Sequence, residues 1–186
     1  TIAFKATITS SAAATDIDGD STVLVGCKDG RLYGYSIKSQ STRTWETRTD
    51  ALSIQGRPLV HENDLLVGAD DGNIYWFSKS KPVFQSRIQL QGGGAIVCEP
   101  LQVKRRIYLG TVDRESFFSA DLSTQQIAFT FRVPDMGGVA HKPVLLDNTI
   151  YFSTDRGRLF ALDAEKGTPR WSYRLEKPII GPPLTD

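Results

Sequence analysis

The stretch Ser-Thr-Asp-Arg-Gly-Arg-Leu-Phe-Ala-Leu-Asp-Ala-Glu-Lys-Gly-Thr-Pro-Arg-Trp, residues 153–171, decides the fold. Asp155-Arg-Gly157 predicts a tight turn, and the residues after it alternate as in a β-strand that ends near Asp163. A polar turn closed by Gly167 follows, and Trp171 opens the next strand. Because fainter copies of this pattern recur three times upstream, the chain is predicted to be an array of β-repeats.

Two sets of landmarks give the period of the repeat. The residues that end an apolar strand just before a turn are 42, 42 and 43 positions apart: Gly26, Gly68, Gly110 and Ser153. The prolines that open successive copies keep steps of 42 and 43: Pro58, Pro100 and Pro143. A period of this length, with strand patterns and no helical spacing of apolar residues, is typical of β-propeller blades.

We therefore predict an all-β fold, a β-propeller segment of four-stranded antiparallel blades. At about 42 residues a blade, the 186 residues hold about four blades, and we expect an incomplete ring. Phe4 precedes Asp16 by the same 12 residues that separate Trp171 from Pro183, which assigns the N-terminus to a preceding blade. Within one domain, 1–186, the expected parts are the last strand of that preceding blade at 1–13, blades at about 14–55, 56–97, 98–140 and 141–177, and the start of a further blade at 178–186.

Composition narrows the classes of protein and partner. Apolar residues make up 40% and charged residues 23% of the chain, which is typical of a globular protein and not of a disordered one. Lys and Arg number 22 against 21 for Asp and Glu, so no excess of positive charge favours nucleic acid or an anionic membrane. No apolar run approaches the roughly 20 residues of a membrane span, so we predict no direct membrane insertion.

The last copy carries a family resemblance. Ala161-Leu-Asp163-Ala-Glu-Lys-Gly167-Thr-Pro-Arg-Trp171 is similar to the tryptophan-docking signature of the pyrroloquinoline-quinone-type propeller repeats, Ala-x-Asp-x-x-Thr-Gly-x-x-x-Trp, with Lys166 in place of Thr. The resemblance implies that each blade's aromatic packs between neighbouring blades and that a strand Asp helps to fix an outer turn. In the second copy, Phe84 is expected to take the place of the aromatic. The positions expected to carry the repeat are Gly26, Gly30, Trp45, Gly68, Gly72, Phe84, Gly110, Asp121, Phe129, Gly157, Asp163, Gly167 and Trp171.

The resembled family includes quinone-dependent alcohol and sugar dehydrogenases, so the resemblance also allows an enzyme. Such enzymes hold a redox cofactor at the ring centre with a calcium ion, use an Asp as general base, and often carry adjacent cysteines. Cys27 and Cys98 are 71 positions apart, and no cluster of carboxylates stands on the strands expected to line the centre. We predict no enzyme, no catalytic residue and no cofactor, and we interpret both cysteines as small packed thiols.

Asp16-Ile-Asp18-Gly-Asp20 is the one candidate metal site, because alternating carboxylates around a Gly-permitted bend suit calcium. The position four after Asp20 is Leu24, where such a loop would supply a further carboxylate, so a polar hairpin turn is the favoured interpretation. His61 and His141 have no partner at ligand spacing, which disfavours a transition-metal site.

Three other segments receive structural interpretations. Lys104-Arg-Arg106 is expected to be a solvated hairpin turn of the third copy. Arg114 stands where the other copies have a turn glycine, which predicts either a different turn or stored strain. Trp76 and Phe77 are expected between blades, with an outward contact surface as the alternative.

The function that follows is a non-catalytic scaffold for protein–protein interaction. The resemblance includes the propeller lipoprotein of the outer-membrane β-barrel assembly machinery, which implies a protein partner and a bacterial cell-envelope location. Periplasmic or extracellular placement is the expectation, with the cytoplasm left open, and self-association would complete the ring. The alternatives are a fragment of a quinone-dependent dehydrogenase and the ligand-sensing domain of a receptor kinase. The partner, the number of blades and the oligomeric state stay open.

Overall fold

The computed structural model describes residues 6–38, 43–81, 83–133, 135 and 137–184, with the side chains of 43–45 also left out. Its secondary structure is entirely strand and turn, and this described part contains no helix that could cross a membrane. The sequence-based expectation of an all-β fold is therefore confirmed. Phe4, the landmark for a preceding blade, lies outside the described residues.

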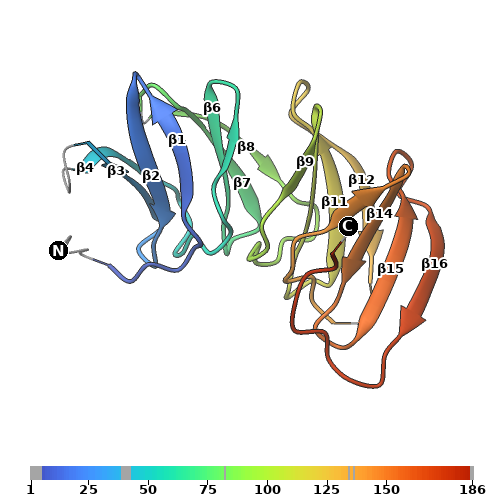
Figure 1. The fold of residues 1–186 in the computed structure, drawn as a ribbon. Coiled ribbons are helices and arrows are strands. Elements are labelled where there is room, and N and C mark those ends of the chain that lie inside the picture. Colours follow the sequence, from blue (N-terminus) through green and yellow to red (C-terminus); the bar gives the residue numbers. More distant parts are fainter. Residues whose placement is uncertain (1–5, 39–42, 82, 134, 136, 185–186) are drawn as a thin grey trace. The chain divides into compact units, whose positions relative to one another are not determined.

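Sixteen strands form four sheets of four strands each, which we number as blades 1 to 4 (Figure 1). Blade 1, in blue and cyan, contains β1 (Ala13–Ile17), β2 (Asp20–Gly26), β3 (Arg31–Ser36) and β4 (Arg43–Arg48). Blade 2 contains β5 (Leu59–His61), β6 (Asp64–Gly68), β7 (Asn73–Ser78) and β8 (Phe84–Gln89). Blade 3 contains β9 (Leu101–Val103), β10 (Arg106–Gly110), β11 (Ser116–Asp121) and β12 (Gln126–Arg132). Blade 4, in orange and red, contains β13 (Val144–Leu146), β14 (Thr149–Ser153), β15 (Arg158–Asp163) and β16 (Pro169–Arg174).

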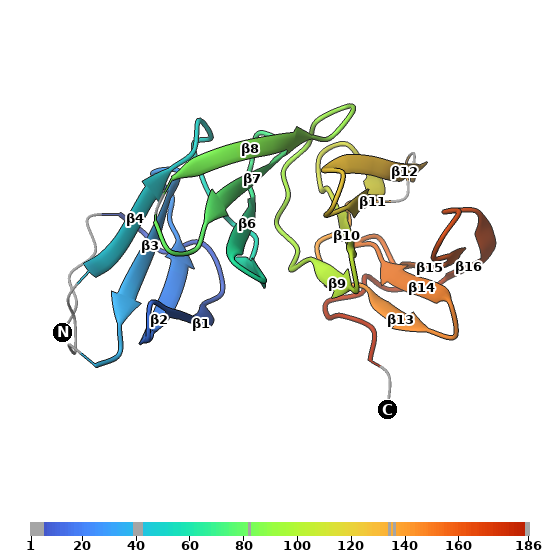
Figure 2. The same cartoon turned by 90° about the horizontal axis from the view of Figure 1, so that it is seen from above.

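Every sheet is an antiparallel meander whose strands lie side by side in chain order, as the second view also shows (Figure 2). The third strand of blades 2 and 3 is buried along nearly its whole length on both faces. The fourth strands β8, β12 and β16 are the most exposed, because they form the outer edge of each sheet. This gradient is the one expected of propeller blades, each of which packs on its neighbours through both faces.

The chain divides into two compact units, residues 1–89 and 90–186, and each unit holds two blades. In the first unit, blade 1 contributes Leu24 and Leu32 to a core that blade 2 completes with Leu65, Val67 and Phe77. These residues are fully buried. Two sheets packed face to face in this way bury the alternating apolar residues of both.

The second unit has the same arrangement, with more aromatic side chains in its core than the first unit has. Phe117 of blade 3 stacks on Phe152 of blade 4 with ring centroids 4.1 Å apart and planes 3° apart. Phe160 and Phe131 pack around this pair. Apolar residues of the second strands are buried in all four blades, and Val23 is partly buried. The buried ones are Val25, Leu66, Ile107, Leu109, Ile150 and Phe152.

Glycines at the ends of the second strands allow the linker between two blades to approach closely. A side chain at Gly26 would overlap Ile54, and one at Gly110 would overlap Val139. Ile54 and Val139 follow blades 1 and 3 and are themselves fully buried. The landmark glycines therefore mark a packing requirement in addition to a turn.

The turn of blade 3 takes the first of the two expected forms, because it differs from the corresponding turns of the other blades. The left-handed residue is Glu115, with φ 47°, and not Arg114, because this turn is one residue longer than the others. The Glu115 carboxylate accepts a hydrogen bond from the backbone N–H of Asp135 at 2.6 Å and lies 3.7 Å from the Arg156 guanidinium. These contacts offset the cost of placing a non-glycine residue in this conformation.

Candidate functional site

The aromatic residue on the fourth strand of blade 3, Phe129, packs on a turn of blade 4. The repeat signature implies this arrangement. Phe129 lies opposite Ser119 in the register of β12 and β11, and its ring is 6.4 Å from that of Tyr108. Gly167 has φ 68°, and a Cβ at this position would overlap the Phe129 ring. The glycine thus supplies both the left-handed turn and the flat surface for the aromatic ring.

The corresponding aromatic position in blades 1 and 4 follows the same register. Trp171 lies opposite Ala161, its ring is 5.8 Å from Tyr151, and 46% of its surface is exposed. Trp45 lies opposite Gly34, although its side chain is outside the described residues. In blades 1, 3 and 4 the residue opposite the aromatic is therefore small, and a β-bulge follows it.

Blade 2 departs from this pattern, and the expectation for Phe84 was wrong. Ser86 occupies the aromatic position, opposite Trp76, whereas Phe84 lies opposite Phe77 on the other face of the sheet. The ring of Phe84 accordingly contacts Tyr75 and Phe77, at 6.3 and 6.0 Å. The Trp76 indole on the third strand thus fills the space that an aromatic side chain of the fourth strand fills in the other blades. Trp76 is 2% exposed, so it does not form the outward contact surface that was the alternative.

Asp163 and Asp121 each organise the turn that follows the third strand of their blade. Asp163 accepts hydrogen bonds from the backbone N–H groups of Glu165 and Lys166, at 3.1 and 3.0 Å, and pairs with Arg170 at 3.0 Å. Asp121 accepts from the N–H groups of residues 123 and 124, at 2.8 and 3.1 Å. These N–H donors lower the pKa of both carboxyls, helped at Asp163 by Arg170.

The remaining repeat glycines lie in turns or at strand ends. The glycines that precede the third strand of three blades have positive φ angles of 71°, 79° and 82°: Gly30, Gly72 and Gly157. Gly68 ends β6 as Gly26 ends β2. A left-handed conformation at these turns explains the recurrence of glycine there.

The candidate calcium residues form a hairpin turn. Asp18 and Gly19 adopt φ angles of 51° and 80°, and the Asp16 carboxylate accepts a hydrogen bond from the Gly19 N–H at 2.8 Å. Residues 16 and 20 flank this turn on paired strands. Throughout the part of the chain that the structure describes, no three His, Cys, Asp or Glu side chains form a group that could hold a metal ion.

Both cysteines are free and buried, as the sequence predicted. Burial raises the pKa of each thiol to about 11, so neither is a reactive thiolate near neutral pH. The Cys98 sulfur lies 3.3 Å from the Gly110 amide nitrogen and 3.5 Å from its carbonyl oxygen, within the core of its blade.

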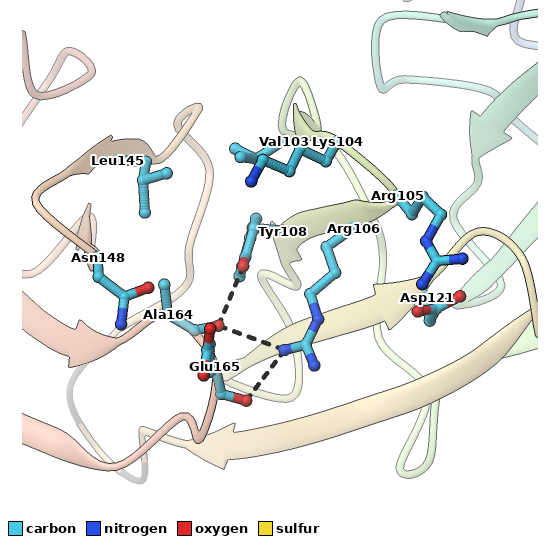
Figure 3. Close-up of a pocket in the computed structure, with 10 residues that line it drawn as sticks. All are labelled: Val103, Lys104, Arg105, Arg106, Tyr108, Asp121, Leu145, Asn148, Ala164 and Glu165. Carbon is cyan, nitrogen blue, oxygen red and sulfur yellow. Dashed lines mark hydrogen bonds between the residues drawn. The ribbon is translucent and has the colours of Figure 1, made fainter.

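The second unit contains a groove between blades 3 and 4 with a volume of about 400 Å³ (Figure 3). We name it the blade 3–4 groove. Figure 3 shows Val103 and Lys104 on one side and Leu145 and Asn148 across from them, with Arg105 beside Asp121. The groove thus joins the first hairpins of two blades to the turns after their third strands.

Hydrogen bonds between the blades close the floor of this groove. The Tyr108 hydroxyl donates to the Ala164 carbonyl oxygen at 3.0 Å. Arg106 Nη1 donates to the Glu165 carbonyl oxygen at 3.0 Å and lies 3.5 Å from that of Ala164 (Figure 3). The solvated-turn interpretation therefore fails for Arg106, which begins β10 and reaches the neighbouring blade.

The polar groups of the groove differ in what they contact. Arg106 and Tyr108 are occupied with backbone carbonyls, whereas Lys104 and Arg105 are exposed at the rim. Sequence reasoning missed this groove, but one signal was present. The hairpin residues 104–105 are both basic, whereas the other three first hairpins begin with Asp or Glu.

Taken together, the four meander sheets and the interblade aromatic contacts define β-propeller blades. Residues 132–186 match the family model described as outer membrane protein assembly factor BamB. The crystal structure of BamB from Moraxella catarrhalis superposes with a TM-score of 0.74 at 18% sequence identity. The match covers 92% of this chain and 54% of the other, so this chain spans about half the length of that protein. No curated protein matches the sequence.

The Phe129–Gly167 contact predicts a coupled effect on stability. Gly167→Ala should lower the free energy of unfolding by about 1–3 kcal/mol, from backbone strain and overlap with the Phe129 ring. In a Phe129→Ala background, Gly167→Ala should cost only the free energy of backbone strain. The decrease in the free energy of unfolding should then be smaller by about 1 kcal/mol. Urea unfolding of the double-mutant cycle measures this difference.

Gly92→Ala is the matched control for this cycle. Gly92 also has a positive φ angle, 94°, but nothing lies within 4 Å of its added Cβ. Its cost should be the same with and without Phe129. Equal costs of Gly167→Ala in the two backgrounds would contradict docking of the ring on the glycine.

Asp163 predicts a specific loss of stability in acid. Its pKa is lower in the folded state, so its contribution is present above the unfolded pKa of about 3.9 and is lost as the pH falls through the folded value. Asp163→Asn should therefore be less stable than the wild type at pH 7, and the difference should shrink as the pH falls through the lowered pKa of Asp163 in the folded state. The midpoint of urea unfolding, measured for both proteins over a range of pH, tests this expectation. Glu176→Gln is the control, because it also removes a carboxylate but at an exposed position. A difference in stability that does not change with pH would contradict a stabilising role for the ionised Asp163 carboxylate.

Proposed function

We propose that the chain is a non-catalytic β-propeller scaffold that binds protein partners in the bacterial cell envelope, on the periplasmic side. The observation that carries the proposal is the contrast between a tightly packed framework and a polar, open interblade groove that contains no reactive group. The described residues offer no metal-binding cluster, and the two thiols are buried in the protonated state. The similarity of residues 132–186 to outer membrane protein assembly factors supports the location and the class of partner.

Two experiments distinguish a non-catalytic scaffold from a quinone-dependent dehydrogenase. Addition of pyrroloquinoline quinone with calcium should produce neither a saturable absorbance change nor reduction of an electron-accepting dye. Photo-crosslinkers placed on the exposed hairpins should instead capture one defined envelope protein, and excess unlabelled propeller should compete with this capture. Saturable dye reduction that requires the quinone would overturn the scaffold assignment.

The outward face of blade 4 supports a further part of the proposal, self-association. Leu146, Trp171 and Tyr173 lie on this face and are 49%, 46% and 62% exposed. Their register equivalents in blade 3 are packed against blade 4: Val103, Phe129 and Phe131. A cavity of about 260 Å³ opens among the exposed side chains.

A second copy of the chain is the occupant that we propose for this face. The blade 3 equivalents show that residues in these positions pack against the apolar face of another blade. Covering them would contribute about 25 cal/mol for each Å² of apolar surface removed from water. The 186-residue chain should therefore associate with itself in solution.

Sedimentation velocity tests this association. The wild-type chain should show a concentration-dependent species larger than the monomer, and Trp171→Glu with Tyr173→Glu should abolish it. Leu52→Glu is the matched control, because Leu52 is 81% exposed in the first unit and is not part of this face. A compact wild-type monomer at every concentration would overturn self-association and leave the scaffold function to be judged by crosslinking.

A further inference from the structure

The first hairpin of blade 3 differs in charge from the first hairpins of the other blades. The registers of the paired strands show that the four turns occupy equivalent positions. The turn pairs are Asp18-Gly19, Glu62-Asn63, Lys104-Arg105 and Asp147-Asn148. Three blades thus place an acidic residue where blade 3 places a lysine.

Lys104 stands in a backbone conformation that does not favour it. Its φ angle is 52°, and Asp18, Glu62 and Asp147 have angles of 51°, 50° and 46° in the same position. Asp and Asn tolerate the left-handed region better than a long aliphatic side chain does, because their short polar groups bond locally to the backbone. The left-handed conformation is common to the four turns, and what distinguishes blade 3 is the positive charge of the residue that adopts it.

The blade 3–4 groove is lined by three cationic side chains, Lys104, Arg105 and Arg106, and by two acidic residues, Asp121 and Glu165. Asp121 directs its carboxylate to the N–H groups of its own turn, and Arg106 donates to neutral carbonyl oxygens. Among the described residues, neither Lys104 nor Arg105 has an ion pair within 4 Å. The rim therefore presents two exposed cations above a third that is fixed in place.

The walls of the groove add an apolar contact beside these cations. Val103 and Leu145 are partly buried members of the core of the second unit, and both also line the groove. Figure 3 shows them on opposite sides, with Lys104 next to Val103. A ligand that places a carboxylate at the rim therefore meets aliphatic surface a short distance along the groove.

We propose that the blade 3–4 groove binds an extended acidic peptide of the protein partner, with its carboxylates at Lys104 and Arg105 and an apolar side chain between Val103 and Leu145. The proposal rests on the scaffold function and names the chemistry that this scaffold recognises. Nucleic acid is disfavoured as the ligand, because Tyr108 is only 3% exposed and offers no ring for base stacking.

The first unit contains a natural contrast to this groove. The corresponding hairpins of blades 1 and 2 begin with Asp18 and Glu62, so the same position between those blades is acidic. An acidic peptide should be repelled there. The binding should therefore be confined to the second unit, and it should weaken as salt screens the rim charges.

Fluorescence anisotropy of the full 186-residue chain with a labelled peptide of alternating Glu and Leu tests the proposal. The wild type should bind this peptide about tenfold or more tightly than its Gln-substituted counterpart at low ionic strength. Lys104→Glu with Arg105→Glu should weaken binding about tenfold or more. Lys79→Glu with Lys81→Glu, which makes the same change in net charge in blade 2, should alter binding by less than about twofold.

The controls separate folding, anion binding and function. Thermal unfolding of the two double variants should match that of the wild type, because the substituted residues 104 and 105 are exposed. Equal weakening by both double variants would overturn the groove, as would equal affinity for a peptide of alternating Lys and Leu. Full competition by inorganic phosphate at equal concentration of charge would show a simple anion site and overturn peptide recognition. If the peptide does not bind while hairpin crosslinking still captures a partner, the groove assignment fails and the scaffold function stands.

Discussion

The structure depends on the packing of one blade face against the next within each unit. A four-stranded meander has two faces, and its third strand is buried on both, so an isolated blade would expose two apolar layers to water. In the second unit, the parallel stack of Phe117 on Phe152 shows how closely the two sheets approach. The repeat period follows from this requirement, because each copy has to present the same two faces at the same positions of its strands.

The parts of the fold that the sequence predicted are those that depend on local chemistry. Glycine at positive φ, as at Gly157, is required by the turn itself and can be found by its spacing alone. The outcome at Phe84 shows where this reasoning ends. Whether a residue of the fourth strand faces one neighbour or the other depends on which side of the β-bulge it lies, because the bulge shifts the register by one position. In blade 2 the large side chain is Trp76 on the third strand, and the small one is Ser86 opposite it on the fourth strand. This reversal involves both positions, so neither residue alone reveals it.

The candidate groove was harder to predict for a related reason. Its floor is closed by contacts from Arg106 and Tyr108 to backbone carbonyl oxygens of the following blade, 56 to 59 residues away. A carbonyl acceptor leaves no mark on the sequence, since every residue has one. Only a comparison of equivalent hairpins between copies isolates the basic turn, and that comparison needs the strand registers that the structure supplies.

Repetition also explains how such a scaffold acquires specificity. The framework residues, such as Gly110 and Gly167, contact the neighbouring linker or blade and cannot change without disturbing the packing. The first hairpins have no such restriction, because their side chains point into solvent and only the left-handed backbone is shared. One blade can therefore carry Lys104-Arg105 where the others carry an acidic residue without disturbing the packing between blades. Equivalent turns with unequal charges would then favour one orientation of a partner, with its acidic segment at the basic turn.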